Sequence, residues 1–184
     1  LRYLVKSGKE QVLTGMALDA DDNLYLWVSD QKPYGIVRDS ICQFGADGRY
    51  VRTLYSIEYE KQDTVPEHTT RTSPLRVEGD TLCFVRYDAY ATQLYAIDLP
   101  TGQSRLLSTL GSDTPFLYND VEAHSDGSYC YAKITGELGT ATPDGVETPL
   151  YQGSYTIADD SGFRPFYIRS AAGALYTYDY WDAA

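Results

Sequence analysis

The sequence is poor in the residues that most often carry out chemistry in proteins. It contains two histidines, three cysteines and one methionine among 184 residues. It also has no C-x-x-C pair, no G-x-S-x-G stretch, no Walker-type phosphate loop and no G-x-G-x-x-G segment. These absences argue against a zinc site, an α/β-hydrolase nucleophile and a nucleotide-binding loop. The sequence therefore predicts no metal and no cofactor.

The chain also has no excess of positive charge and no long apolar run. Its 15 Lys and Arg stand against 26 Asp and Glu, which gives a formal net charge of -11. A field of that sign repels DNA or RNA, so we expect no nucleic-acid partner. No stretch of about 18 apolar residues is present, so we expect no membrane insertion within this chain. Because the chain opens on Leu1 inside a strand-like run, we expect it to be part of a larger protein.

What the sequence does contain favours β-structure. It has 18 Tyr, 5 Phe and 2 Trp, and aromatic side chains suit the half-buried surface of a strand. Its 15 Gly and 8 Pro are scattered between short apolar runs, where they mark turns. The fold class predicted is all-β.

The stretch 15–54 has the pattern of one complete antiparallel meander. An apolar run is followed by a polar turn and the strand Leu24–Val28, and after a longer loop come a strand at Ile41–Phe44, a turn, and a strand at Tyr50–Leu54. A single four-stranded sheet has two open edges and a face that it cannot bury alone. We therefore expect further copies.

The chain supplies such copies, and they predict a single β-propeller-like domain over residues 1–184. In the fourth unit we expect strands at Tyr155–Ala158, Arg164–Ile168 and Ala174–Tyr180, with the last strand of the blade supplied by the N-terminal residues 1–8. Four visible units are equally compatible with part of a larger ring. The blades are predicted at about 12–57, 73–110, 119–153 and 155–181 plus 1–8.

Two of the units resemble known propeller families. The first is similar to an NHL-like blade, because it has a G-x-A-x-D start at Gly15, then D-x-N-L-Y-L from Asp21, and later I-x-x-F-x-x-D-G from Ile41. The stretch QLYAIDLPTGQ in the second resembles the third strand of TolB-like and quinoprotein-like blades. The resemblance implies a propeller that acts as a non-enzymatic binding or sensor module. It also favours an extracytoplasmic location, periplasmic or cell-surface, in a bacterial receptor or lipoprotein.

The connections fall into two sets that lie at opposite ends of a meander. Tight turns join the first strand to the second and the third to the fourth, whereas the other end carries longer loops. Loops held by a rigid scaffold are where binding usually occurs, so we expect the binding face at the long-loop end. Those loops are predicted at Ser29–Ser40, Glu58–Thr72, Arg86–Thr92 and Leu110–Asn119.

Three cations are predicted to meet at that end. When the second strands are superposed on Cys83, Cys130 and Phe166, equivalent positions hold Arg86, Lys133 and Arg169. Such a group can hold a small anion such as a carboxylate or phosphate. The alternative is that each cation neutralises a nearby Asp or Glu at the sheet rim.

Aromatic side chains near the same end are candidates for a stacking wall. Such a wall would bind a sugar, a peptide or an aromatic ligand, and the alternative is packing within the rim. The residues are Trp27, Tyr34, Tyr87, Tyr90, Phe116 and Tyr118.

The remaining polar motifs favour structural roles. The acidic run at Asp19–Asn23 resembles the start of a calcium loop but has Leu24 where an EF-hand needs glycine, so we expect a capped hairpin turn. The three cysteines lie in apolar strands and are expected to be buried thiols. His68 lies on a long loop, and His124 lies beside a tight turn, away from the favoured face.

The function predicted is binding of a small anionic, aromatic or sugar ligand at the long-loop face. Two alternatives stay open. One is a propeller hydrolase or lyase that uses carboxylates facing the pore. The other is a protein-interaction scaffold that binds a peptide or protein partner on its loop rim.

Overall fold

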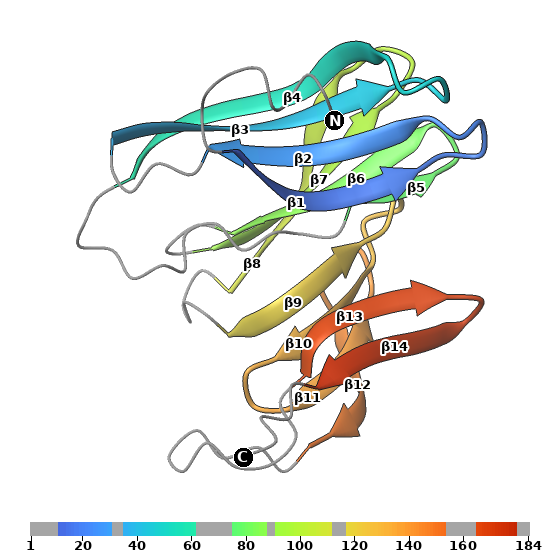
Figure 1. Cartoon of the computed structure of the whole chain (residues 1–184). Coiled ribbons are helices and arrows are strands. Elements are labelled where there is room, and N and C mark those ends of the chain that lie inside the picture. Colours follow the sequence, from blue (N-terminus) through green and yellow to red (C-terminus); the bar gives the residue numbers. More distant parts are fainter. Residues whose placement is uncertain are drawn as a thin grey trace.

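The computed structural model describes residues 11–30, 35–61, 75–87, 91–111, 117–153 and 165–179, and its regular elements are β-strands (Figure 1). Three antiparallel sheets have four strands each, in chain order, and a fourth sheet has two. No helix among these residues has the length and apolar character needed to cross a membrane.

Sheet A contains β1 (Gln11–Leu18), β2 (Leu24–Asp30), β3 (Gly35–Phe44) and β4 (Tyr50–Lys61). Sheet B contains β5 (Arg76–Glu78), β6 (Thr81–Tyr87), β7 (Thr92–Asp98) and β8 (Ser104–Leu110). Sheet C contains β9 (Tyr118–Ala123), β10 (Tyr129–Lys133), β11 (Glu137–Ala141) and β12 (Glu147–Gln152), and sheet D contains β13 (Pro165–Ala171) and β14 (Ala174–Asp179).

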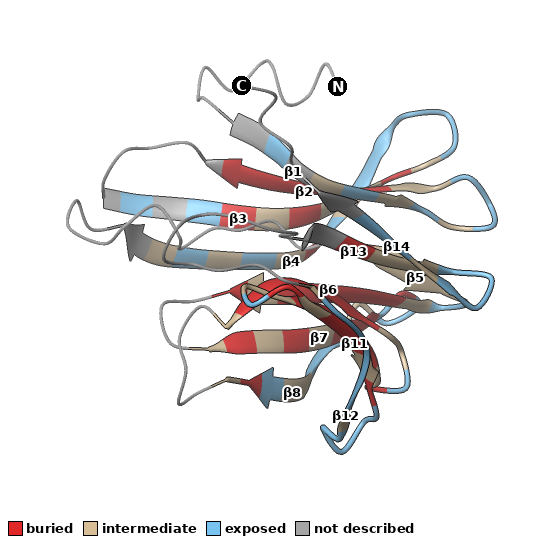
Figure 2. Ribbon diagram, turned by 90° about the horizontal axis from the view of Figure 1, so that it is seen from below, coloured by how far each residue is buried: buried red, intermediate tan, exposed pale blue. Residues whose placement is uncertain are grey.

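Successive sheets pack against one another, and side chains link three strands, β5, β9 and β13, which we call the inner strands. Strand β1 packs near β5, β9 packs against β6, and β13 packs against β9 and β10. Side chains from both faces fill the spaces between successive sheets, and Figure 2 shows the buried residues in the strands, whereas the exposed ones lie in the turns and along outer strands such as β12. The predicted fold class, a propeller-like array of four-stranded antiparallel meanders, is confirmed.

The structure describes two strands of the fourth unit. Strand β13 occupies the place beside sheet C that β9 occupies beside sheet B, and a tight turn at 172–173 joins it to β14. It is the first strand of sheet D among the described residues, whereas the sequence interpretation places Arg164–Ile168 second, after Tyr155–Ala158. The closing strand predicted at residues 1–8 and the strand at Tyr155–Ala158 lie outside the described residues.

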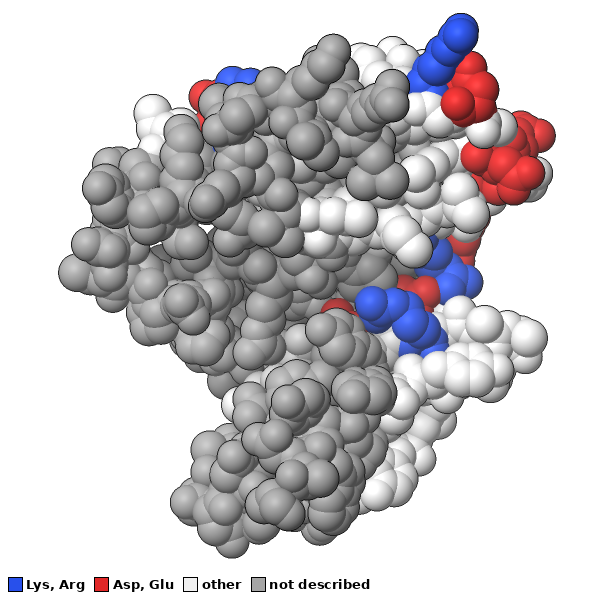
Figure 3. Space-filling view, in the orientation of Figure 1, with Lys and Arg blue, Asp and Glu red and all other residues white. Residues whose placement is uncertain are grey.

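The tight turns gather at one end of the array, which we call the turn end, at the right of Figure 1. At the β1–β2 turn, the carboxylate of Asp19 accepts hydrogen bonds from the backbone N–H groups of Asp21 and Asn23, each at 2.9 Å. It also accepts the hydroxyl of Tyr25 at 2.8 Å. The capped turn predicted for the acidic run is confirmed. Figure 3 shows acidic side chains gathered at this end of the molecule.

Candidate functional site

Two of the three predicted anion-binding cations are already paired with carboxylates of the protein. The Nζ atom of Lys133 lies 2.8 Å from Glu137 and 2.6 Å from Glu147, and its side chain is 14% exposed. Burial acts to lower the pKa of Lys133, but the hydrogen bonds to the two glutamates outweigh it and raise that pKa. This ion-paired cluster joins β10, β11 and β12, which is the structural alternative considered for Lys133.

Arg169 does not occupy the position predicted for it. It lies on β13, the first described strand of its sheet, whereas Arg86 and Lys133 lie on second strands. Its Nη1 atom is 2.7 Å from Asp120, whose side chain is 4% exposed. The superposition does not hold for Arg169, because β13 packs against sheet C as β9 packs against sheet B. Burial raises the pKa of Tyr55, and the third cation, Arg86, acts to lower it.

The aromatic residues predicted to form an open wall are core residues where the structure describes them. Trp27 is 6% exposed and packs edge-on against Phe84 at a centroid distance of 5.2 Å. Tyr87 and Tyr118 are each 8% exposed and lie between sheets B and C. The open-wall interpretation does not hold for these three rings, because all three are buried between sheets. Tyr34, Tyr90 and Phe116 lie outside the described residues.

We call the end opposite the tight turns the loop end. In sheet A, strands β3 and β4 extend further toward this end than β1 and β2 do. Pairing between β2 and β3 ends at Ser29 and Asp39, whereas β3 and β4 stay paired as far as Gly35 and Lys61. Residues 35–38 and 58–61 therefore form a two-stranded β3–β4 arm, visible in Figure 1. Ile36 in this arm is 62% exposed.

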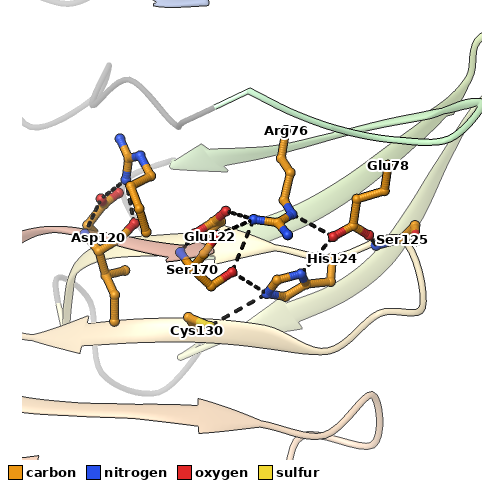
Figure 4. Close-up of polar contacts among 10 residues, drawn as sticks. Arg76, Glu78, Asp120, Glu122, His124, Ser125, Cys130 and Ser170 are labelled. Carbon is orange, nitrogen blue, oxygen red and sulfur yellow. Dashed lines mark hydrogen bonds and ion pairs between the residues drawn. The ribbon is translucent and has the colours of Figure 1, made fainter. Parts of the chain in front are cut away.

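A polar cluster that the sequence interpretation missed lies where the inner strands β5, β9 and β13 meet (Figure 4). Alternate residues of β9 face β13, because side chains two apart lie on one face of a strand. Asp120 accepts the backbone N–H of Ile168 at 3.0 Å, and Glu122 accepts that of Ser170 at 2.6 Å. The two carboxylates therefore take the place that a neighbouring strand's carbonyl groups take in a sheet.

Both carboxylates are buried, each residue being 3% exposed, and each has a cationic partner. Arg169 binds Asp120, and Arg76 of β5 binds Glu122. Arg76 also donates to the carbonyl oxygen of Ser170 at 2.8 Å. Burial raises the pKa of Asp120, although Arg169 acts to lower it. Arg76 thus ties all three inner strands together at one point.

Glu78 and His124 continue the cluster toward the turn end. The Nδ1 atom of His124 lies 2.9 Å from Glu78, and the backbone N–H of Ser125 donates to the same carboxylate at 2.8 Å. Burial acts to raise the pKa of Glu78, but the hydrogen bonds from Ser125 and His124 outweigh it and lower the pKa to about 2. An ionised Glu78 only accepts, so Nδ1 donates to it, and a ring that carries this single proton has Nε2 as an acceptor.

Two groups lie near that acceptor. Ser170 Oγ is 3.4 Å and Cys130 Sγ 3.5 Å from Nε2. Burial raises the pKa of the Cys130 thiol, and that of Cys83 to about 12, so both thiols stay protonated at neutral pH. Cys83 and Cys130 are buried as predicted, whereas Cys42 is only partly buried.

A hollow of about 410 Å³ opens on sheet B at the turn end, and not at the end predicted to bind. Its lining is mostly polar and has no aromatic ring. The residues are Thr81, Ala96, Asp98, Thr101, Gln103, Ser104 and Arg105. Within the part of the chain that the structure describes, no group of three or more His, Cys, Asp or Glu is placed to hold a metal ion.

The sheets and their inner polar cluster define a propeller-like β-repeat protein. Comparison with protein-family models and with curated proteins finds no match. Among solved structures, the chain is similar to one described as "Crystal structure of Nidogen/Laminin Complex", with a TM-score of 0.44 and 15% identity. The match covers 92% of this chain and 72% of that chain. A likeness this distant says nothing about what this chain binds, and the resemblance to NHL-like and TolB-like blades stays a prediction.

Proposed function

We propose that this protein is a binding module that engages another protein at its loop end. The observation that carries the proposal is the β3–β4 arm, where two paired strands extend beyond β2. The arm presents Ile36, which is 62% exposed, next to the exposed ion pair of Arg38 and Glu58. An apolar side chain bordered by charged ones is the composition of a protein interface, with its apolar centre and polar rim.

A protein partner fits the arm better than a small ligand does. Lys133 and Arg169 are neutralised by carboxylates of the protein, so neither offers its full charge to an anion. Trp27, Tyr87 and Tyr118 are buried, so they offer no stacking surface. An extended β-ribbon, in contrast, binds other polypeptides through its backbone and its alternating side chains.

The proposal is tested by quantitative capture of proteins from an extract of the source organism, with the wild-type chain and two variants as baits. Ile36→Asp places a charge in the arm. The matched control, Val146→Asp, changes a side chain of similar exposure, 59%, in the β11–β12 turn at the other end. A protein captured by the wild type and by Val146→Asp, but weakened about 10-fold or more by Ile36→Asp, supports the proposal.

The same partner is then purified and titrated against all three chains. Equal affinity for the wild type and Ile36→Asp contradicts the arm as the binding surface. Loss of binding in Val146→Asp alone would move the interface to the turn end.

A further inference from the structure

A relay of hydrogen bonds at the turn end links the side chains of Glu78, His124 and Ser170 (Figure 4). Protein binding at the loop end does not require this relay. Glu78 lies 2.9 Å from Nδ1 of His124, and Ser170 Oγ lies 3.4 Å from Nε2. The three residues come from three different sheets or their turns. An acid, an imidazole and a hydroxyl in this order form the arrangement by which an imidazole takes a proton from a nucleophile.

The electrostatics of the relay fit that role. Glu78, with its pKa lowered to about 2, is ionised at neutral pH and fixes the tautomer in which Nε2 accepts a proton. Arg76 donates to Ser170 Oγ at 3.1 Å, so a guanidinium lies beside the attacking oxygen and favours the loss of its proton. The distance of 3.4 Å is slightly long, as is common for such pairs without a substrate.

Ser170 is better placed as a nucleophile than Cys130, the other group near Nε2. Cys130 is 4% exposed and its thiol has a pKa raised by burial. Ser170 is partly exposed and lies one residue before the end of β13, close to the exposed turn of sheet D. The side chain of His124 is 18% exposed, so the relay is open to solvent at this end.

We propose that Ser170 is a nucleophile toward small activated carboxylic esters, with His124 as its general base and Glu78 as the positioning residue. Ser170 Oγ forms a bond to the acyl carbon while its proton passes to Nε2 of His124. The bond from the acyl carbon to the leaving oxygen breaks, and the leaving group takes up that proton. Water then attacks the acyl-serine and gives one proton to Nε2 of His124. The bond from the acyl carbon to Oγ breaks, His124 passes that proton to Oγ, and the carboxylic acid leaves with Ser170 and His124 restored.

The experiment uses the full chain with p-nitrophenyl acetate as the probe, followed by peptide mass spectrometry. We expect an acetyl group on Ser170 and release of p-nitrophenol. Ser170→Ala should lower the release by about 100-fold, within the range that general-base catalysis contributes. The matched control Ser104→Ala, an exposed serine on β8, should behave as the wild type. No acetylation of Ser170 in the wild type, or equal release by Ser170→Ala, overturns the proposal.

A pH profile separates a base from a merely structural histidine. The acylation rate of the wild type should rise as His124 loses its proton, and His124→Gln should abolish that rise. The charged and titratable groups that face the ring are Glu78 and Arg76 from β5, Glu122 and Cys130 from sheet C, and Asp126 from the adjacent turn. If Ser170→Ala or His124→Gln fails to fold, the site of acetylation in the wild type and its own pH profile still decide. A profile without that rise overturns the role of His124.

Discussion

The joint between sheets A and B and the joint between sheets C and D use opposite chemistry. Between A and B, the ring of Phe84 on sheet B lies 4.8 Å from that of Tyr55 and 5.2 Å from that of Trp27, both on sheet A, measured between centroids. Between C and D, Asp120 and Glu122 accept backbone N–H groups of β13. One joint is held by apolar area, and the other by directional bonds to buried charges.

The difference shows how one strand can be joined to a strand of the next sheet without backbone-to-backbone hydrogen bonds. Burial of rings is non-directional and tolerates small shifts between sheets. A carboxylate, in contrast, binds the N–H groups of an inner strand only in one register, and leaves a buried charge uncompensated if the partner moves. The C–D joint therefore fixes the position of β13, whereas the A–B joint is held by buried apolar side chains.

The largest expected effect comes from breaking the apolar joint. Phe84 is 0% exposed, and Phe84→Ala removes the ring that touches both Trp27 and Tyr95. We expect a loss of about 3–5 kcal/mol in the free energy of unfolding, from lost burial and the cavity left behind. Urea denaturation followed by fluorescence measures it. A loss below about 1 kcal/mol would mean that the two sheets do not pack through this ring.

Breaking the polar joint comes next. Asp120→Ala leaves the N–H of Ile168 without this acceptor and removes the carboxylate partner of Arg169, at a cost of about 3 kcal/mol. Asp120→Asn keeps one acceptor oxygen and should cost about 1–2 kcal/mol. The same denaturation experiment compares the two. Equal losses in both variants would mean that shape, and not hydrogen bonding, is what Asp120 contributes.

Acid should lower the stability of the polar cluster through Glu78. Its pKa is about 2 in the folded chain against a reference value of 4.5, so its contribution is fully present above pH 4.5 and is lost as the pH falls toward 2. The wild type should therefore lose more stability than Glu78→Gln between pH 6 and pH 3. Asp120 acts in the opposite direction, because burial raises its pKa. Parallel curves for the two proteins would contradict the assignment to Glu78.

The smallest effect is expected outside both joints. The Arg38–Glu58 pair in the β3–β4 arm has side chains that are 58% and 52% exposed. Arg38→Ala should change the free energy of unfolding by about 0.5 kcal/mol or less, since exposed ion pairs are screened by solvent. A loss as large as that of Asp120→Ala would show that the arm is part of the core and not an exposed extension.

Much of the fold was predictable from sequence, because turn chemistry and strand pattern agree in the first three units. Asp19 caps its turn as its sequence context predicts, and the strands on either side follow. The fourth unit is harder to predict, because residues 165–179 hold two strands and one turn, and nothing in their alternation distinguishes a first strand from a second. Only the packing of β13 against β9 fixes its order.

The sequence does contain a pattern that indicates the polar cluster. Asp120, Glu122 and His124 alternate with Val121 and Ala123, so one whole face of a buried strand is polar. Such a pattern indicates a face that meets hydrogen-bond partners from elsewhere in the fold. Its partners, Arg76 and Ser170, lie 46 and 48 residues from Glu122, and no local pattern points to them.

Amide hydrogen exchange of β13 tests the central claim most directly, namely that Asp120 and Glu122 stand in for a neighbouring strand. The wild type should protect the amides of Ile168 and Ser170, which face the carboxylates. Asp120→Ala should raise exchange at Ile168, and Glu122→Ala at Ser170, each by 10-fold or more, while Arg169 between them stays protected by its pairing with β14. Unprotected Ile168 and Ser170 amides in the wild type, or protection unchanged in both variants, would contradict the account.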